Sequence, residues 1–356
     1  MTSPARRRAH VVGLGLIGAS IARALGEAGW DVTGADLDDT VTQNALASSV
    51  VVPGALDEDV TLVVVATPAG AVAAAARSVL ESNVNPDLIV TDVAGVKSSI
   101  VAEVGDARFL GGHPMAGSEQ RGLAGARADL FRGCTWVLTP TPSTSARAYS
   151  TLHGILRDIG ATVVAIDAED HDRLVALASH VPHLVAGALM NEAARAAEED
   201  AVLLQLAAGG FRDMTRVAAG DPTIWPDVLF ENRSAVSKAL ESLEMRLGTL
   251  RRALDEGERE VVETSLRTAA QSRRHLPGRA LSADNLAYLR VVVSDQPGQL
   301  SAVTTAASEM SVNIYDIEIA HGIEGAGGTL LLAVDAHQAD TFRDALSALG
   351  FTAARE

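Results

Sequence analysis

Four side chains, three imidazoles and one guanidinium, lie in short segments interrupted by glycine or proline and could together accept a proton and hold an anionic group. They are His113, His180, His183 and Arg216. A neutral imidazole can accept a proton near neutral pH, and a guanidinium can hold a carboxylate through two hydrogen bonds. Taken singly, each has a plainer interpretation, because an isolated histidine is more often a structural hydrogen-bonding residue and an isolated arginine a surface charge. As a set, they indicate a substrate pocket.

The sequence predicts no metal site. Neither a carboxylate nor a third histidine lies at a helpful spacing from His180 and His183. Cys134 is the single cysteine, which excludes an internal disulfide framework and any multi-cysteine zinc or iron–sulfur centre. We therefore expect a metal-free protein of the reducing cytoplasm.

A glycine-rich turn near the start of the chain predicts a dinucleotide site. It consists of Gly13, Leu14, Gly15, Leu16, Ile17 and Gly18, between a strand pattern and a helical pattern. Such glycines allow a tight turn, close approach of the backbone to a pyrophosphate and packing of helix on strand. Asp36 follows the second predicted strand, 36 − 13 = 23 residues later, near the spacing expected of a ribose-binding carboxylate. Because no arginine or lysine follows it in Leu37–Thr40 to hold a 2′-phosphate, we expect NAD rather than NADP.

These residues require an α/β domain of the Rossmann type to position them. The expected strands are His10–Gly13, Asp31–Ala35, Thr61–Ala66, Leu88–Thr91, Phe109–Gly111, Trp136–Thr139 and Thr162–Ile166. Helices are expected at Leu16–Ala28, Ala69–Glu81 and Val96–Val104. Continuous apolar strands separated by helices predict a parallel sheet covered on both faces. His113 would then lie on a loop just after a strand, on the ligand side of the sheet.

From about Glu169 to Arg274 the pattern becomes all-helical. One stripe consists of Leu240, Leu243, Leu247, Leu250 and Leu254, at intervals of 3, 4, 3 and 4 residues. The stripe is either the buried face of a helix within one chain or a subunit interface, since so narrow a stripe resembles a coiled-coil seam.

The last part of the chain has the order of a ferredoxin-like unit. Strand, helix, strand, strand, helix and a weak final strand are expected at Ala287–Val293, Leu300–Met310, Asn313–Ala320, Thr329–Val334, Ala339–Leu349 and near Phe351. The sequence thus predicts a dinucleotide-binding domain at 1–168, a helical dimerisation and substrate domain at 169–275, a linker at 276–284 and a βαββαβ domain at 285–356.

Charge and composition exclude several classes of protein. Lysine and arginine number 29 against 45 aspartates and glutamates, a formal net charge of −16, which argues against binding nucleic acid or an anionic membrane surface. The composition is 47% hydrophobic and 21% charged, as in an ordinary globular protein. The apolar run Leu62–Ala76 is too short to span a bilayer and is broken by Pro68 and Gly70, so no membrane span is expected.

Within about residues 10–275, eight segments read, in order, GLGLIGAS, ADLDD, VVVATP, DVAGVKSS, GGHPMAGSE, SHVPH, GGFRDMTR and DPTIW. Taken together, they resemble the motifs of the prephenate/arogenate dehydrogenase family of tyrosine biosynthesis. Many families share the dinucleotide glycines, whereas GGHPMAGSE with SHVPH and GGFRDMTR is specific. The last unit, which contains DQPGQL at 295–300, resembles an ACT domain, which some members carry.

The resemblance implies oxidative decarboxylation of prephenate with NAD. Hydride leaves C4, and loss of the ring carboxylate as CO2 makes the ring aromatic. By resemblance, His113 is the base at the C4 hydroxyl, and Arg216 and His183 bind the dianionic substrate. Further substrate positions are Glu119, Trp225, His180 and Ser98, while Thr67 and Pro68 would lie against the nicotinamide ribose. Relatives also dimerise through the helical region, which implies a homodimer.

The chain departs from the family pattern at Gly95. Members commonly read Gly-Ser-Val-Lys where this chain has Ala94-Gly95-Val96-Lys97, so the serine expected near the C4 hydroxyl is absent. Ser98 or Ser99 from the next turn, or a water, could take its place.

Three alternative functions remain open from the sequence. An arogenate dehydrogenase would act on the amino analogue of prephenate. A β-hydroxyacid dehydrogenase would use a lysine base, and Lys97 and Lys238 are the two lysines in the chain. A non-catalytic regulator would bind NAD and an amino acid, although His113, His183 and Arg216 in their motifs favour an enzyme.

The ACT resemblance implies an amino-acid effector, with tyrosine the leading candidate. Its site would consist of Asp295, Gly298, Leu300, Asn313 and Ile314, the last two from a neighbouring copy. A turn before a helix offers backbone N–H groups to a carboxylate. The alternative is that the unit only assists assembly.

Overall fold

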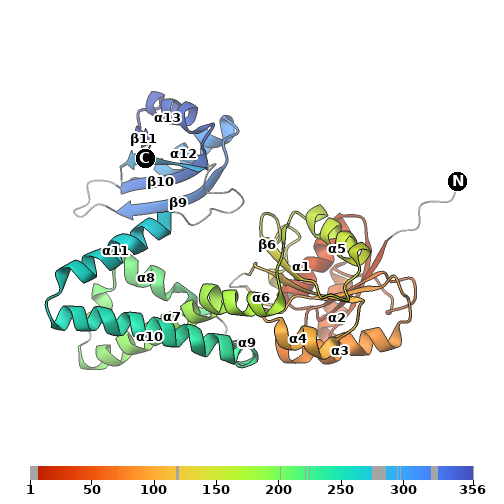
Figure 1. Ribbon diagram of the computed structural model, residues 1–356. Helices are drawn as coiled ribbons and strands as arrows, with labels where there is room; N and C mark the ends of the chain where they lie inside the picture. Colours follow the sequence, from red (N-terminus) through yellow and green to blue (C-terminus); the bar gives the residue numbers. More distant parts are fainter. Residues whose placement is uncertain are drawn as a thin grey trace. The chain divides into compact units, whose positions relative to one another are not determined.

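The computed structural model describes residues 7–117, 120–200, 202–220, 222–223, 225–274, 286–294, 296, 298–321 and 328–355 (Figure 1). The chain divides into two compact units, Met1–Thr249 and Leu250–Glu356, and each is described by itself. The expected linker at 276–284 lies outside the described residues.

The first unit contains a seven-stranded sheet of order β2-β1-β3-β4-β5-β6-β7. Its strands are β1 (Arg8–Val12), β2 (Asp31–Ala35), β3 (Leu62–Val65), β4 (Ile89–Asp92), β5 (Phe109–Pro114), β6 (Thr135–Thr139) and β7 (Thr162–Ala165). All seven lie where the sequence predicts them, within a few residues. The first five strands in this order are parallel to one another, so the carboxyl ends of β2, β1, β3, β4 and β5 share one edge.

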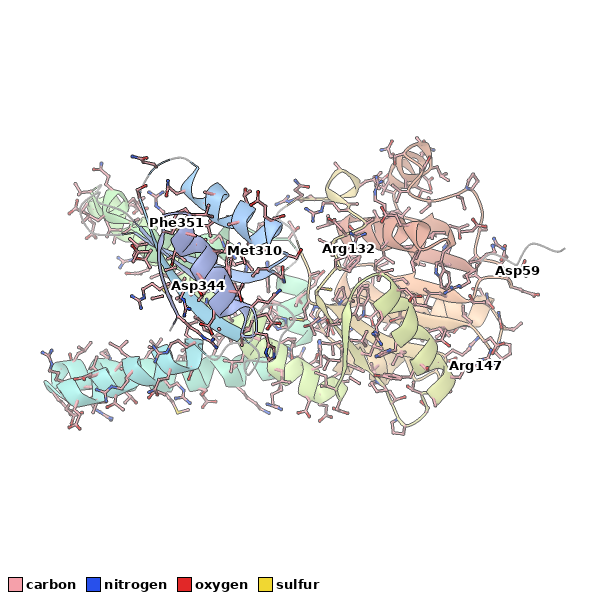
Figure 2. All side chains as sticks on the ribbon, turned by 90° about the horizontal axis from the view of Figure 1, so that it is seen from above. Asp59, Arg132, Arg147, Met310, Asp344 and Phe351 are labelled. Carbon is pink, nitrogen blue, oxygen red and sulfur yellow. The ribbon has the colours of Figure 1, made fainter. Side chains whose placement is uncertain are left out.

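Helices cover both faces of this sheet. They are α1 (Leu16–Glu27), α2 (Asp39–Ala47), α3 (Ala69–Ser82), α4 (Ser98–Val104) and α5 (Ala146–Asp158). Alternate residues of β3 face opposite sides: Leu62 and Val64 pack in a core with α1 and α5, whereas Val63 and Val65 pack with α3 and α4. Charged side chains such as Asp59 and Arg147 project outward from this unit (Figure 2).

Two details of the expected sheet are wrong. β6 runs antiparallel to β5, with Gly111 opposite Thr139 and His113 opposite Val137. A parallel return requires a crossover element, and the described residues between β5 and β6 contain only the short 3₁₀ turn η1 (Leu123–Gly125). The same pairing extends β5 through Pro114, so His113 lies within the strand rather than on a loop after it.

The all-helical region appears where it is expected. It consists of α6 (Ala168–Val175), the π-helical turn η2 (Ala176–His180), α7 (Val181–Glu199), η3 (Leu203–Leu206), α8 (Gly209–Thr215), η4 (Arg216–Ala219), α9 (Trp225–Glu231), α10 (Arg233–Asp255) and α11 (Arg259–Arg274). Among the described residues, the continuous run Ala168–Glu199 has the length and apolar composition to cross a membrane, with 28% of its window buried. A single run of this kind is weak evidence, because core helices pass the same test.

The leucine stripe lies on α10 and is not buried within the chain. Leu247 and Leu254 are 55% and 69% exposed, and the other three leucines are half-buried. A stripe of leucines this exposed favours the subunit-interface interpretation over an intrachain core.

The second unit has the expected βαββαβ order. After α11 come β8 (Leu286–Val293), α12 (Gln299–Glu309), β9 (Ile314–His321), β10 (Gly328–Asp335), α13 (Ala339–Ala348) and β11 (Thr352–Arg355). The antiparallel sheet has the order β11-β8-β10-β9. Alternate residues of β8, such as Leu289 and Val291, enter a core with Val303 of α12 and Phe342 of α13. The ferredoxin-like prediction is confirmed.

Candidate active site

The three glycines of the first turn differ in what a side chain at each position would contact. Gly13 has φ +93°, and a Cβ there would lie 2.6 Å from the carbonyl oxygen of Ala66. A Cβ on Gly18 would lie 1.9 Å from the carbonyl oxygen of Gly13. A Cβ on Gly15 would meet no atom within 4 Å, so the backbone there is open. Two glycines therefore serve the fold, and the third leaves the start of α1 accessible to a ligand.

Asp36 lies beside this turn at the end of β2. Its Oδ2 accepts a hydrogen bond from the Leu14 N–H at 2.7 Å, and its Oδ1 accepts one from the Asp38 N–H at 3.1 Å. The carboxylate is thus fixed next to the glycine turn, where a ribose would bind. Leu37 beside it is fully exposed.

The residues Thr67 and Pro68 follow β3 on the same edge of the sheet. The Thr67 hydroxyl is buried and has no hydrogen-bond partner among the described residues, and Pro68 precedes α3. The Thr67 backbone nitrogen lies 3.2 Å from the position of a Cβ on Gly13. A buried hydroxyl normally finds a partner, so the unpaired hydroxyl, the open Gly15 and the fixed Asp36 together fit a bound dinucleotide.

His113 lies on the same edge, at the end of β5, and belongs to a chain of hydrogen bonds. Its Nδ1 lies 2.9 Å from Nε2 of His171, and His171 Nδ1 lies 2.8 Å from Oδ1 of Asp172. The Asp172 carboxylate also accepts the backbone N–H groups of Lys97 and Ser98, each at 2.8 Å. The start of α4 therefore holds Asp172 of α6, and Asp172 and His171 in turn hold His113 of β5.

Burial, the adjacent His171 ring and the Lys97 ammonium hold the pKa of His113 well below its usual value. Burial alone would raise the pKa of Asp172, but the hydrogen bonds from His171, Ser98 and Lys97 hold it below its usual value. At neutral pH, His113 is therefore a neutral imidazole and Asp172 an ionised carboxylate.

Lys97 is not placed to serve as the alternative base. Its side chain is completely buried and paired with Asp92, whose carboxylate also accepts the N–H groups of Ala94 and Gly112 at 2.9 and 3.0 Å. This ion pair fixes the backbone turn that carries Gly95. An enclosed and paired ammonium cannot touch a substrate, which argues against a lysine-based hydroxyacid dehydrogenase.

Gly95 leaves room for a side chain next to the imidazole of His113. A Cβ at this position would lie 3.7 Å from Nε2 of His113 and 3.7 Å from Cγ1 of Val228 on α9. These are ordinary contact distances, so a side chain would fit where this chain has none. The Nε2 atom consequently faces Gly95, with Val228 of α9 on the other side of the position where a side chain would lie.

Ser98 and Ser99 use their side chains elsewhere. The Ser98 hydroxyl donates to the Ala168 carbonyl at 3.0 Å, and the Ser99 hydroxyl donates to Glu231 Oε2 at 2.9 Å. Ser98, expected at the substrate, is therefore a residue that holds α4 and Asp172 in place, because both its hydroxyl and its backbone N–H contact α6.

The other predicted substrate residues surround α7. His180 ends the π-helical turn and is buried, with Nδ1 3.3 Å from Nδ2 of Asn232. Asn232 Nδ2 also donates to the Asp172 carbonyl at 2.8 Å. Trp225 lies edge-on to His180 and stacks on His183 with 3.7 Å between ring centroids. π-helical turns often mark functional sites.

Arg216 begins η4, which packs along α7, and its side chain is exposed. The position of a Cβ on Gly220 in the same loop lies 3.4 Å from His183 Cε1. Partial burial lowers the pKa of His183, so its imidazole offers a hydrogen bond rather than a charge at neutral pH. Arg216 then has to supply the positive charge for a carboxylate. Glu119 lies outside the described residues.

Sequence reasoning missed His171, Asp172, Asn232 and Val228. The run Ala168–Arg173 contains four charged residues and one histidine and is typical of a solvated first turn of a helix. The adjacency of a histidine and an aspartate at the start of the helical region is the one signal that could have drawn attention to it.

Comparisons with known proteins agree with this geometry. Residues 21–165 match the family described as prephenate dehydrogenase, nucleotide-binding domain, and residues 167–268 match prephenate dehydrogenase, dimerization domain. The chain belongs to the prephenate dehydrogenase family. It is 30% identical to a prephenate dehydrogenase of Bacillus subtilis over 91% of each chain.

Solved structures of other prephenate dehydrogenase family members are similar. The Aquifex aeolicus enzyme, in complex with hydroxyphenyl propionate and NAD+, is 29% identical, with a TM-score of 0.70 over 76% of this chain and 99% of that one. A Synechocystis arogenate dehydrogenase is 30% identical, with a TM-score of 0.66 over 75% and 98%. The family assignment, NAD as cofactor and the helical dimerisation region are thereby confirmed.

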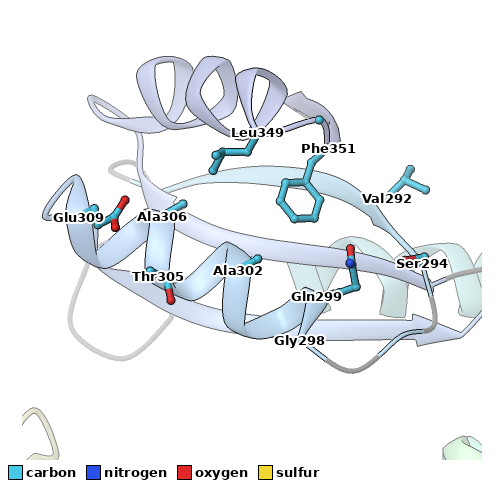
Figure 3. A pocket seen from close by; sticks show the side chains of 11 residues that line it. Val292, Ser294, Gly298, Gln299, Ala302, Thr305, Ala306, Glu309, Leu349 and Phe351 are labelled. Carbon is cyan, nitrogen blue, oxygen red and sulfur yellow. The ribbon is translucent and has the colours of Figure 1, made fainter.

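The second unit contains a groove of about 860 Å³ between α12 and the turn from α13 to β11 (Figure 3). Gly298 and Gln299 lie at one end of α12 and Glu309 at the other, and Leu349 and Phe351 lie across the groove from the helix. Of the expected effector residues, Gly298 lines the groove with φ +95° at the start of α12, whereas Leu300, Asn313 and Ile314 are not among the lining residues. Asp295 lies outside the described residues.

Proposed function

We propose that this chain oxidises prephenate with NAD and releases 4-hydroxyphenylpyruvate and CO2. The observation that carries the proposal is the neutral His113, whose Nε2 faces Gly95, where a side chain would fit, at the sheet edge where the glycine turn also lies. Bound NAD would accept the hydride from C4 of the substrate. His113 would accept the C4 hydroxyl proton as the C–O bond acquires double-bond character, and would return it to the phenol oxygen.

The remaining residues would bind and orient the substrate. Arg216 would pair with one carboxylate of the dianion, and His183, held by its stack on Trp225, would donate a hydrogen bond. A local cation is needed because the protein carries a net charge of −16. His180 would support Trp225 from the side, and Glu119 is proposed as a further pocket residue. Thr67 and Pro68 would contact the nicotinamide ribose.

The test is the absorbance of NADH formed from prephenate or from arogenate under identical conditions. Faster formation from prephenate would support the proposal. Formation from neither substrate would contradict it and would favour a non-catalytic regulator. A variant with His113→Asn distinguishes true turnover from contamination by other dehydrogenases.

Arogenate is the second candidate substrate, because one of the similar structures is an arogenate dehydrogenase. Arogenate carries an amino group where prephenate carries a keto oxygen, and an acidic pocket residue would favour it. A kcat/KM that is higher for arogenate than for prephenate would assign the chain to that activity.

We also propose a homodimer that forms through the helical region and buries the exposed leucines of α10. Light scattering of a chain that ends near Leu276 tests this proposal. A dimer is expected, and a monomer would contradict the helical interface.

We infer that the second unit binds an amino acid, most simply tyrosine, and lowers activity. Its ferredoxin-like fold and the turn at Gly298, which opens the N-terminus of α12, support this inference. Removal of residues 280–356 should leave activity intact and abolish inhibition by tyrosine. Equal competitive inhibition of both forms would show instead that tyrosine binds at the active site.

A further inference from the structure

We propose that His171 and Asp172 are positioning residues that fix the tautomer of His113, so that Nε2 carries the lone pair that accepts the substrate proton. The inference deepens the proposed function and rests on it for the identity of the substrate. It begins from two contacts, His113 Nδ1 to His171 Nε2 at 2.9 Å and His171 Nδ1 to Asp172 Oδ1 at 2.8 Å.

The tautomers follow from the end of the chain of hydrogen bonds. An ionised carboxylate can only accept hydrogen bonds, so His171 must donate from Nδ1 to Asp172. A neutral His171 then has its acceptor at Nε2. His113 must donate to that acceptor from its own Nδ1, which leaves the lone pair of His113 on Nε2. Each step follows from the one before it for a neutral His171, whereas a doubly protonated His171 would donate from Nε2 and reverse the tautomer of His113.

The lone pair fixed in this way lies on the open side of the ring. Nε2 faces the space left by Gly95 and bounded by Val228, whereas Nδ1 faces His171 inside the protein. The opposite tautomer would put a hydrogen on Nε2 and leave no acceptor for the C4 hydroxyl. The tautomer therefore decides whether this histidine can act as a base.

Asp172 is itself held by two other segments of the chain. Its carboxylate accepts the N–H groups of Lys97 and Ser98 at the start of α4, and its carbonyl accepts Nδ2 of Asn232 between α9 and α10. His171 is completely buried and so does not exchange its partner for water. The orientation of His113 is thus set by residues that do not reach the open space themselves.

The proton balance is simple. When the C4 hydroxyl gives its proton to Nε2, the new imidazolium keeps its Nδ1–H bond to His171, and the Asp172 carboxylate stabilises the charge through His171. The proton returns to the phenol oxygen of the product, so the two positioning residues need not change their protonation. The other ionisable groups that face His113 are Lys97 and His180. Neither side chain can carry a negative charge, so neither can replace the carboxylate.

Two substitutions of His171 test the proposal. In His171→Gln, the amide oxygen can accept the Nδ1–H of His113, whereas His171→Leu offers no acceptor. We expect kcat to fall about 10²-fold or more in the leucine variant and less than about tenfold in the glutamine variant, with the KM for prephenate and the Kd for NAD little changed in both. The buried His10, which contacts Thr33 away from this site, provides the control variant His10→Gln with normal kcat.

A spectroscopic measurement does not depend on turnover or on the folding of any variant. Long-range ¹H–¹⁵N correlation spectra of the ¹⁵N-histidine-labelled wild-type protein should show His113 protonated at Nδ1 and His171 protonated at Nδ1 as well. A hydrogen on Nε2 of His113, or equal kcat in the two His171 variants, would overturn the proposal. Because the tautomer is measured without substrate, failure of the prephenate assay would count against the proposed function and not against this assignment.

Discussion

The nucleotide turn and the proton-accepting site lie on the same edge of one sheet but are built in different ways. The turn is made by backbone: six consecutive residues and the neighbouring Asp36, fixed by contacts such as Asp36 with Leu14. The proton-accepting site is made by side chains from β5, α6, α9 and the residue before α10, together with two backbone N–H groups at the start of α4. One is local in the sequence, and the other depends on contacts between residues as far as 75 positions apart.

This difference indicates which of the two regions can change substrate specificity. A backbone turn is restricted to glycine wherever a Cβ would collide, as at Gly13 and Gly18, and therefore binds the same cofactor across many substrates. A side-chain network can lose or gain one member, as at Gly95, while the base and its partners remain in place. We expect substitutions in the second region to alter catalysis and substrate binding, and substitutions in the first to alter folding and cofactor binding.

The largest expected effect is at the centre of the side-chain network. The substitution His113→Asn removes the proton acceptor and should lower kcat by about 10²–10⁴-fold, the usual range for a positioned general base. NAD affinity should hardly change, because the glycine turn is untouched. Steady-state kinetics and NAD titration measure the two effects, and His153→Asn on α5 serves as the control. Near-normal kcat in His113→Asn would remove His113 from the chemistry.

A second large effect is expected at the mouth of the same region. Arg216→Ala should weaken substrate binding by about 2–5 kcal/mol if one carboxylate loses its partner, which is roughly a 30- to several-thousand-fold rise in KM. Arg212 lies in the same segment, is exposed and donates to the Ala207 carbonyl, so Arg212→Ala provides a matched control. An unchanged KM in Arg216→Ala would place the substrate carboxylates elsewhere.

The two regions also differ in how far the sequence predicts them. The glycine turn, Asp36 and every strand of the first sheet follow from local patterns, because burial on both faces leaves continuous apolar runs and the turn needs glycine at fixed positions. The antiparallel direction of β6 and the hydrogen bond between His171 and Asp172 do not follow from local sequence patterns. Strand direction depends on the missing crossover helix, and the burial of a polar helix turn depends on what packs over it.

Two alanine substitutions in the glycine turn separate folding from cofactor binding. A Cβ on Gly18 would overlap the Gly13 carbonyl, so Gly18→Ala should destabilise the protein by about 1–3 kcal/mol. A Cβ on Gly15 meets nothing in the protein, so Gly15→Ala should keep the wild-type melting temperature and weaken NAD binding about tenfold, because the pyrophosphate approaches there. Thermal melting and NAD titration of both variants test this contrast, and equal melting temperatures would contradict it.

The smallest expected effect concerns pH and sharpens the account of the side-chain region. Burial, His171 and Lys97 hold the pKa of His113 well below 6.5. A base with a lowered pKa is already neutral at pH 6.5 and loses its function only when acid protonates it, so kcat/KM for prephenate should stay level from neutral pH through 6.5 and fall only at distinctly lower pH. A profile of kcat/KM between pH 4.5 and 8, with NAD saturating and the folded fraction checked by circular dichroism, measures this. Loss of half the activity at or above pH 6.5 would mean that His113 is more open to water than its enclosure by His171 and Lys97 implies.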